Sequence, residues 1–206
     1  MKLPREFYKE DGISLAKKLL GKVLVHHTAE GVTKGIIVET ESYMGIVDAA
    51  AHSYKGKKDG RCNIQYKEGG YAYIYMIYGM YYCMNIVANE EEVPEVVLLR
   101  ALEPLEGIPL MEQRRKTVKR KALLSGPGKL CQAMGIGKES YGLDLCGNQL
   151  YVEEPEEMTA FEIEASKRIN IDYAGEAKDY LWRFTIKNNA YVSVKVKQKI
   201  SKNSIL

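Results

Sequence analysis

The sequence predicts a single mixed α+β domain over residues 1–206, with a largely antiparallel β-sheet, a protruding β-hairpin and flanking helices. Three observations predict this class. The chain has 206 residues, of which 46% are apolar, enough for one hydrophobic core. β-Branched and tyrosine-rich runs, separated by turn signals, fill most of the first half. Helical periodicity then resumes near the middle, which favours helices packed on a sheet.

The N-terminal part predicts one helix and one hairpin. Residues 11–20 (DGISLAKKLL) have a short amphipathic pattern that a glycine closes. Residues 22–28 and 34–40 are β-branched runs separated by AEGVT, which is a hairpin signal. We expect the acidic pair Glu39 and Glu41 to lie at the far end of the second strand.

A tyrosine-rich segment predicts the protruding hairpin. In residues 71–76 (YAYIYM) tyrosines alternate with apolar residues, so one face of the strand carries tyrosine and the other is aliphatic. A Tyr-Gly pair at 78–79 predicts a turn into a return strand at 81–88. The following run, VVLLRA at 96–101, predicts a buried strand that carries one charge, Arg100.

Two central helices and several short strands complete the predicted domain. A helix follows Pro109, and a second opens in SGPGKLCQAM, with Ser125 or Gly126 as its cap and Pro127 in its first turn. The later strand candidates are residues 151–152, 161–171, 181–186 and 191–196.

The composition excludes several classes of protein. No apolar run approaches the roughly 20 residues that a membrane span needs. The start, MKLPREFYKE, lacks the apolar stretch of a secretory signal. We therefore expect a soluble protein in the cytoplasm, with no membrane partner. Four cysteines without a CxxC pair predict reduced thiols rather than a disulfide framework or a zinc site.

A net charge of +3 conceals a strong local asymmetry. Residues 111–140 carry eight lysines or arginines against two glutamates, whereas residues 151–164 carry six glutamates and no basic residue. Tyrosine is also concentrated, with seven of the 15 between positions 66 and 82. A basic patch and exposed aromatic rings suit nucleic-acid phosphates and bases respectively. Each also has an ordinary explanation, because basic runs are usually solvated helix faces and tyrosine is a common strand residue.

Three common catalytic motifs are missing from the sequence. The GPGKL segment has Leu123 where a phosphate loop begins with glycine, and Leu130 where its magnesium-binding hydroxyl would stand. His26 and His27 are adjacent and face opposite sides of a strand, so they form no metal clamp. The sequence has no GxSxG motif, so nothing supports a serine hydrolase that uses this nucleophile turn. The helix start at 125–130 remains able to bind one backbone phosphate through its free amide groups.

The remaining candidate for chemistry is VETESY, followed by AAAHS. Within a strand Glu41 and Tyr43 face the same way, so a carboxylate and a ring would share one wall of a pocket. An isolated glutamate is more often a solvated residue at a strand end. The other residues of these segments favour a pocket around Glu41. Tyr43 and the tyrosine strand could form a slot for a planar ligand, and Arg100 and the basic patch could contact phosphates.

Four blocks occur in order along the chain: VETESYMGIVDAAAHS, YAYIYMIYGMYYCMNI, VVLLRALEPLEG and SGPGKLCQAMGI. Together they resemble the alkyladenine (3-methyladenine) DNA glycosylase family, from about residue 15 to about residue 194. The resemblance implies a monofunctional glycosylase that excises 3-methyladenine, 7-methylguanine, hypoxanthine or ethenoadenine from damaged double-stranded DNA. It also implies a monomer that needs no metal, no other cofactor and no protein partner.

The resemblance assigns the centre of the site to five residues. Glu41 matches the carboxylate that activates water, and Arg100 matches the arginine that helps to orient that water. Tyr43, His52 and Tyr75 match the walls between which an extruded purine stacks.

The resemblance also assigns contacts around this centre. Asn85 matches the asparagine that crowds a guanine amino group. Tyr78, with Gly79 and Met80, matches the hairpin tip that enters the minor groove and fills the gap in the base stack. Lys129, at the SGPGKL helix start, is a candidate for contact with the DNA backbone.

One segment departs from the family pattern. The family carries an Arg-Asn and then a Met-Phe or similar pair before the tyrosine strand, whereas this chain reads RCNIQYKEGG. Arg61 and Tyr66 are candidates for the related places, but Cys62 and Gln65 do not match. The departure leaves the DNA-contact role of this loop open and does not affect the pocket residues.

Two other functions fit part of the sequence. A noncatalytic nucleic-acid-binding module would stack exposed bases on the tyrosine strand and use Glu41 only structurally. A nucleoside hydrolase would act on free nucleosides, which the basic helix argues against. For a glycosylase, a single carboxylate without an evident pocket lysine favours direct hydrolysis over a Schiff-base lyase.

Overall fold

The architecture is a curled antiparallel sheet with helices packed against it, seen here in a computed structural model that describes residues 1–157 and 159–195. The strands are β1 (Val23–Thr28), β2 (Gly31–Tyr43), β3 (Ala72–Ile77), β4 (Tyr81–Ala88), β5 (Glu95–Glu106), β6 (Leu150–Glu153), β7 (Ile163–Ser166) and β8 (Arg183–Ile186). The α-helices are α1 (Gly12–Lys18), α2 (Ile108–Arg115), α3 (Arg120–Leu123) and α4 (Pro127–Met134).

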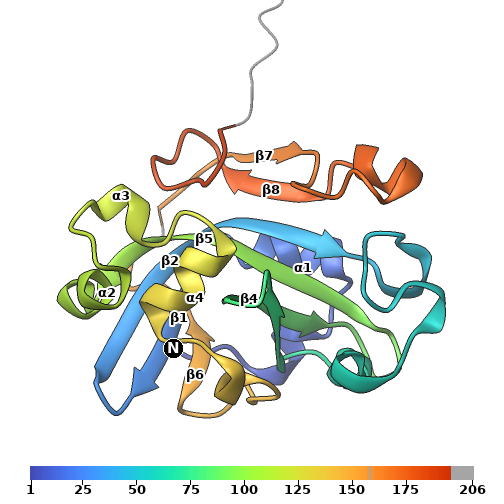
Figure 1. The fold of residues 1–206 in the computed structure, drawn as a ribbon, viewed down its shortest axis with the longest axis horizontal. Coiled ribbons are helices and arrows are strands. Elements are labelled where there is room, and N and C mark those ends of the chain that lie inside the picture. The colour runs from blue at the N-terminus through green and yellow to red at the C-terminus, as the bar shows by residue number, and fades with distance from the viewer. Residues whose placement is uncertain (158, 196–206) are drawn as a thin grey trace, which may run out of the picture.

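The eight strands form one sheet in the order β3-β4-β5-β2-β1-β6, with β8 paired to β2 and β7 paired to β8 (Figure 1). All of these pairs are antiparallel. The predicted α+β class with a largely antiparallel sheet is therefore confirmed.

Strand β2 is the central element, and it is longer than predicted. It pairs with β5 along one edge, while β1 and then β8 take the other edge in succession. These neighbours extend the strand through Tyr43, so Glu39 and Glu41 lie inside the strand and not at its end. The prediction that this strand ends at residue 40 is wrong. The acidic residues suggested an exposed strand end, but the sequence does not show that β5 and β8 pair with the two edges of β2 there.

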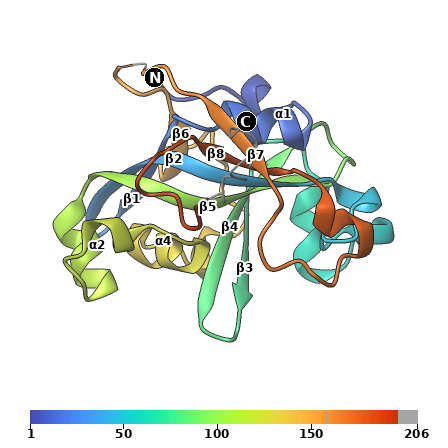
Figure 2. The ribbon, with the colours of Figure 1, turned by 90° about the horizontal axis from the view of Figure 1, so that it is seen from above.

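The predicted hairpin consists of β3 and β4, and it protrudes from the sheet (Figure 2). Tyr78 and Gly79 form its turn with φ values of 52° and 67°, and the Met80 N–H donates to the Ile77 carbonyl at 3.2 Å. Such a turn suits glycine at its second position, whereas positive φ is unusual for tyrosine. Tyr78 therefore has a left-handed backbone conformation that is rare for tyrosine, and its side chain is exposed at the hairpin tip.

Helices cover both sides of the sheet, with α1 on one side and α2 and α4 on the side from which the hairpin projects (Figure 2). The Asp11 side chain caps α1 by accepting from the Ile13 and Ser14 amides. Gly126 is the cap residue of α4 and Pro127 is its first residue, as one of the two predicted alternatives had it. Buried leucines from both helices, with strand residues, form one continuous core.

The C-terminal part departs most from prediction. Of the predicted strand at 161–171, only Ile163–Ser166 is a strand, and Tyr191–Lys195 is not one. The last predicted position, Val196, lies outside the described residues. The segment before it is held by other contacts, because the Ser193 N–H donates to the Glu39 carboxylate at 2.6 Å.

Two composition-based expectations can be compared with the structure. Cys62, Cys83, Cys131 and Cys146 are free thiols. None of the helices found in residues 1–157 and 159–195 has both the length and the apolar character that crossing a membrane requires.

Candidate active site

Glu41 lies two residues before the C-terminal end of β2, with none of its surface exposed. Its Oε2 atom accepts hydrogen bonds from the Tyr43 hydroxyl at 2.9 Å and from Arg100 Nη1 at 3.3 Å. Its Oε1 atom accepts from the Ile169 amide at 2.7 Å. Three donors surround one fully buried side chain, so the alternative of a solvated strand-end residue is wrong.

Arg100 connects this carboxylate to a second one. It comes from β5, which pairs with β2, and its Nε donates to Glu39 at 3.2 Å. Arg183 of β8 donates to the same Glu39 oxygen at 2.7 Å. Burial alone would lower the pKa of Arg100, but the charges of Glu41 and Glu39 raise it overall. Two carboxylates and two guanidinium groups thus balance their charges inside the sheet.

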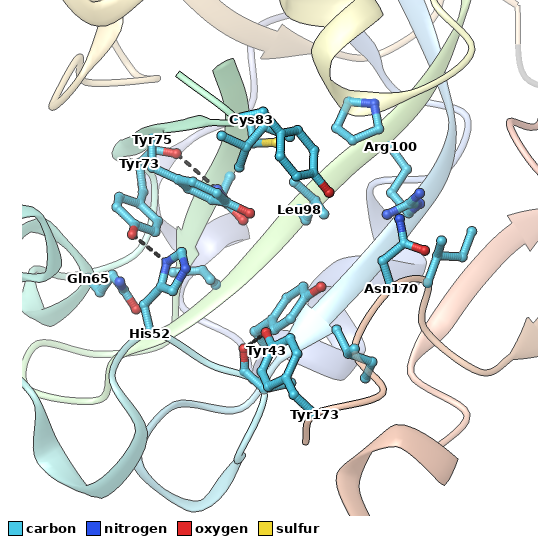
Figure 3. Close-up of a pocket in the computed structure, with 18 residues that line it drawn as sticks. Tyr43, His52, Gln65, Tyr73, Tyr75, Cys83, Leu98, Arg100, Asn170 and Tyr173 are labelled. Atoms are coloured by element: carbon cyan, nitrogen blue, oxygen red, sulfur yellow. Dashed lines mark hydrogen bonds between the residues drawn. The ribbon is translucent and has the colours of Figure 1, made fainter. Parts of the chain in front are cut away.

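A cavity of about 290 Å³ opens in front of this cluster (Figure 3). Glu41 does not itself line the cavity, whereas its three hydrogen-bonding partners Tyr43, Arg100 and Ile169 do. The carboxylate therefore lies directly behind the cavity wall. The remaining lining residues come from the tyrosine hairpin, the 50–65 segment, β5, α4 and the 169–173 segment: Ala50, His52, Gln65, Tyr73, Tyr75, Ile77, Tyr78, Cys83, Asn85, Val96, Leu98, Pro127, Asn170, Ile171 and Tyr173.

Aromatic rings face each other across the cavity, with Tyr75 on one side and Tyr43 and Tyr173 on the other (Figure 3). The Tyr43 ring is supported from behind by the Arg168 guanidinium, 4.7 Å from the ring centre. Arg168 is itself buried in an ion pair with Asp48. This pair holds the loop after β2 against the segment that precedes Ile169.

His52 lies at the end of the cavity that is farthest from Arg100 (Figure 3). Its Nδ1 atom and the Tyr73 hydroxyl are 2.7 Å apart in a hydrogen bond, and its ring meets Tyr75 edge to face at 4.6 Å. Burial, helped by the charges of Arg61 and Lys57, lowers the pKa of His52 to about 4. The ring is therefore neutral at pH 7.

The other polar groups of the cavity are uncharged at neutral pH. Burial raises the pKa of Tyr75, and burial together with the Glu41 charge raises the pKa of Tyr43. Burial also raises the pKa of the Cys83 thiol to about 11. Asn85 is fixed in the floor, where its Nδ2 donates to the Tyr73 carbonyl at 3.1 Å. Within the described parts of the chain, no three His, Cys, Asp or Glu side chains are grouped as a metal site requires.

The predicted DNA-contact residues lie at the mouth and outside. Tyr78 lines the cavity mouth and is 79% exposed, and Met80 beside it on the hairpin tip is also exposed. Gly79 completes that tip. Lys129 is exposed in the first turn of α4, whose Pro127 reaches the cavity.

Comparison with known proteins decides the family. The sequence profile described as "Methylpurine-DNA glycosylase (MPG)" matches residues 6–190. The chain belongs to the methylpurine-DNA glycosylase family. It is therefore a DNA glycosylase, a hydrolase that acts on N-glycosyl bonds.

Similar proteins occur in species of Clostridium and Desulfitobacterium. A protein of Clostridium acetobutylicum is 52% identical, and the match covers 94% of this chain and 98% of the relative. Proteins of Clostridium novyi and Desulfitobacterium hafniense are 52% and 48% identical, with 94% of this chain and 99% of each relative covered. All three bear the name "Putative 3-methyladenine DNA glycosylase".

The structure of this glycosylase brings six of the predicted site residues together around the cavity: Glu41, Tyr43, His52, Tyr75, Asn85 and Arg100. Several neighbours were missed. Tyr73 lies on the same face of β3 as Tyr75, so the alternation of tyrosine and apolar residues in this strand could have predicted its place in the cavity wall. Gln65 and the 169–173 segment carried no local signal, because only the fold brings them to the cavity.

Proposed function

We propose that this DNA glycosylase turns alkylated or deaminated purines out of duplex DNA and hydrolyses their bond to the sugar. The proposed substrates are 3-methyladenine, 7-methylguanine, hypoxanthine and ethenoadenine. The observation that carries the proposal is the fully buried Glu41 carboxylate behind an aromatic-walled cavity. Such a slot suits one planar base, and the adjoining carboxylate suits the sugar carbon to which that base is attached.

The cavity and hairpin supply the means of holding an extruded base. Extrusion costs a few kcal/mol and costs least for damaged, weakly paired bases. Stacking between Tyr43 and Tyr75 would offset much of this cost, since each base–aromatic contact contributes roughly 1–3 kcal/mol. The exposed Tyr78 at the hairpin tip would fill the gap left in the duplex. Lys129 and the α4 amides would hold a nearby phosphate.

Glu41 and Arg100 are assigned the chemistry. Arg100 lines the cavity and donates to Glu41, so a water held beside Arg100 would meet both groups. Glu41 would accept a proton from that water as it attacks C1′. Its charge would also favour the oxocarbenium-like sugar that forms as the bond breaks. The products are a free base and an abasic site.

The proposal is tested with lesion-containing duplexes. The purified protein is incubated with a duplex that holds one hypoxanthine, or with methylated DNA that contains 3-methyladenine. Alkali and heat then break the strand wherever an abasic site has formed. We expect breakage at the lesion only. Tight binding without breakage would support the noncatalytic module, and turnover of free nucleosides would support a nucleoside hydrolase.

A further inference from the structure

Gln65 presents a buried hydrogen-bond donor without a partner at the His52 end of the cavity. Its side chain lines the cavity and is 1% exposed. Among the described residues no group accepts a hydrogen bond from its Nε2 atom. Leaving a buried amide donor unpaired is costly, and most such groups in proteins are satisfied. A bound ligand that supplies an acceptor would remove this cost.

The surroundings of Gln65 hold it in place. It lies in the short 3₁₀ segment Gly60–Tyr66, the part of the sequence that departs from the family pattern. The Tyr66 hydroxyl donates to the Lys57 carbonyl at 3.1 Å, and the Cys62 thiol donates to the His52 carbonyl at 3.6 Å. These contacts tie the segment to the loop that carries His52. Gln65 is therefore part of a fixed wall.

The orientation of a bound purine follows from the two ends of the cavity. The sugar end must face Glu41 and Arg100, where the glycosidic bond is hydrolysed. Gln65 and His52 lie at the opposite end, so they face the edge of the base that is farthest from the sugar (Figure 3). That edge of a purine carries position 6. Hypoxanthine has an accepting oxygen there, whereas 3-methyladenine has a donating amino group.

We propose that Gln65 is a specificity-determining residue for neutral 6-oxopurines, to which its side-chain amide donates a hydrogen bond at O6. The proposal rests on the excision of damaged purines proposed above and names the feature that selects among them. Gln65 is one of the two positions at which this segment does not match the pattern of the family that the sequence resembles.

The chemistry explains why the donor matters for one class of lesion. When the C1′–N9 bond breaks, its electron pair stays with the base. Hypoxanthine is neutral in DNA and leaves as an anion, whose charge is shared by O6 and strengthens a hydrogen bond there. The anion then takes a proton from solvent, while Glu41 takes one from the attacking water. A 3-methyladenine base is cationic in DNA and leaves neutral, so it needs no such stabilisation.

The neighbouring side chains do not replace Gln65 in this role. His52 is neutral at pH 7, so it is not a ready acid, and its Nδ1 atom is engaged with Tyr73. Burial raises the pKa of Tyr73, so its hydroxyl keeps its proton at pH 7 and is engaged with His52.

Two substitutions test the proposal. Gln65→Met keeps the length of the side chain and removes its hydrogen-bonding groups, while Gln65→Glu keeps the shape and replaces the donor by a negative charge. Single-turnover rates are measured on a hypoxanthine duplex and as free 3-methyladenine released from methylated DNA. In Gln65→Met we expect hypoxanthine excision to fall about tenfold to hundredfold and 3-methyladenine release to change less than about threefold. Gln65→Glu should lose more hypoxanthine excision than Gln65→Met.

The outcomes separate a selective role from a structural one. Equal losses on both substrates, or an unchanged rate on hypoxanthine, would overturn the proposal. Retained 3-methyladenine release in either variant shows that the fold and catalytic groups are intact. The proposed function is judged on the wild-type protein alone: if it releases neither base, the proposed function fails and the role of Gln65 falls with it.

Discussion

At the scale of single residues, burial decides the state of each group in the cavity. Glu41 is surrounded by three hydrogen-bond donors, while Tyr43, Tyr75 and His52 are neutral at pH 7. The cavity therefore has neutral rings along its walls and its charged groups at the Arg100 end. This division suits stacking at one place and proton transfer at another.

Asn85 is the residue on which exclusion of normal guanine is expected to depend. Its amide is fixed by the Tyr73 carbonyl, so it does not swing away from a bulky base. We predict that Asn85→Ser raises the ratio of guanine to hypoxanthine excision by about tenfold or more, because the smaller side chain leaves room for the 2-amino group. Duplexes with one normal or one lesion base measure this ratio. An unaltered ratio would rule out the steric role.

His52 makes stability depend on pH. Its pKa is about 4 in the folded chain, below the ordinary value of 6.5, so the unfolded chain binds the proton first as pH falls. The free energy of unfolding should therefore drop between pH 7 and pH 5, by up to about 2 kcal/mol for this residue and by less where solvent screens the ring. Urea unfolding at both pH values should show a smaller drop for His52→Asn; an equal drop would refute the assignment.

At the scale of elements, the β3–β4 hairpin and β2 do different work. Strand β2 is rigidly paired on both edges and places Glu41 and Tyr43 on one face. In the described part of the chain, the hairpin pairs with the rest of the sheet only through β4 residues 85–88, and it presents an exposed tip with positive φ at Tyr78. The proposed function is thus divided between a fixed strand that carries Glu41 and a projecting hairpin that would reach the DNA.

The hairpin tip carries a further mutational prediction. We expect Tyr78→Ser to weaken binding to a lesion duplex by about tenfold to hundredfold, because one stacking ring is lost. Tyr78→Asn suits the positive φ and should weaken binding to the same degree. Phe161→Ser, which removes an exposed ring beside α1, is the matched control. If Tyr78→Ser and Tyr78→Asn bind the lesion duplex as tightly as the wild type does, Tyr78 does not fill the gap in the base stack.

At the scale of the whole molecule, charge is separated across the sheet. The helices α2, α3 and α4 carry the basic cluster on the side of the hairpin, while the acidic residues around β7 lie on the side of α1 (Figure 2). Arg114 and Arg115 are used internally, since they donate to Glu30 and to the Leu123 carbonyl. The exposed remainder of the basic residues in 111–140 is Lys116, Lys119, Arg120, Lys121, Lys129 and Lys138.

This separation predicts salt-dependent DNA binding. The logarithm of the affinity should fall linearly with the logarithm of salt concentration, and Lys129→Ala should make the slope shallower by about one. Lys18→Ala is the control, because Lys18 lies on α1 and is paired with Glu10. Fluorescence anisotropy over a series of salt concentrations measures both slopes. An identical slope for Lys129→Ala would remove that residue from the phosphate contacts.

Local patterns predicted the strands and helices that are fixed by short-range signals. Alternation identified the tyrosine face of β3, and the Gly-Pro pair identified the start of α4. The length of β2 was not predictable, because it depends on β5 and β8 from distant parts of the chain. The same holds for the site: Glu41 was found from its own motif, whereas Gln65 and Ile169 reach it only through folding.

The central claim is that Glu41 is the base that activates water. Glu41→Gln keeps the size of the side chain and most of its hydrogen bonds, so we predict wild-type affinity for a lesion duplex. Single-turnover excision by the same preparation should fall by about a hundredfold to ten-thousandfold. Retained affinity together with excision at the wild-type rate would contradict the claim.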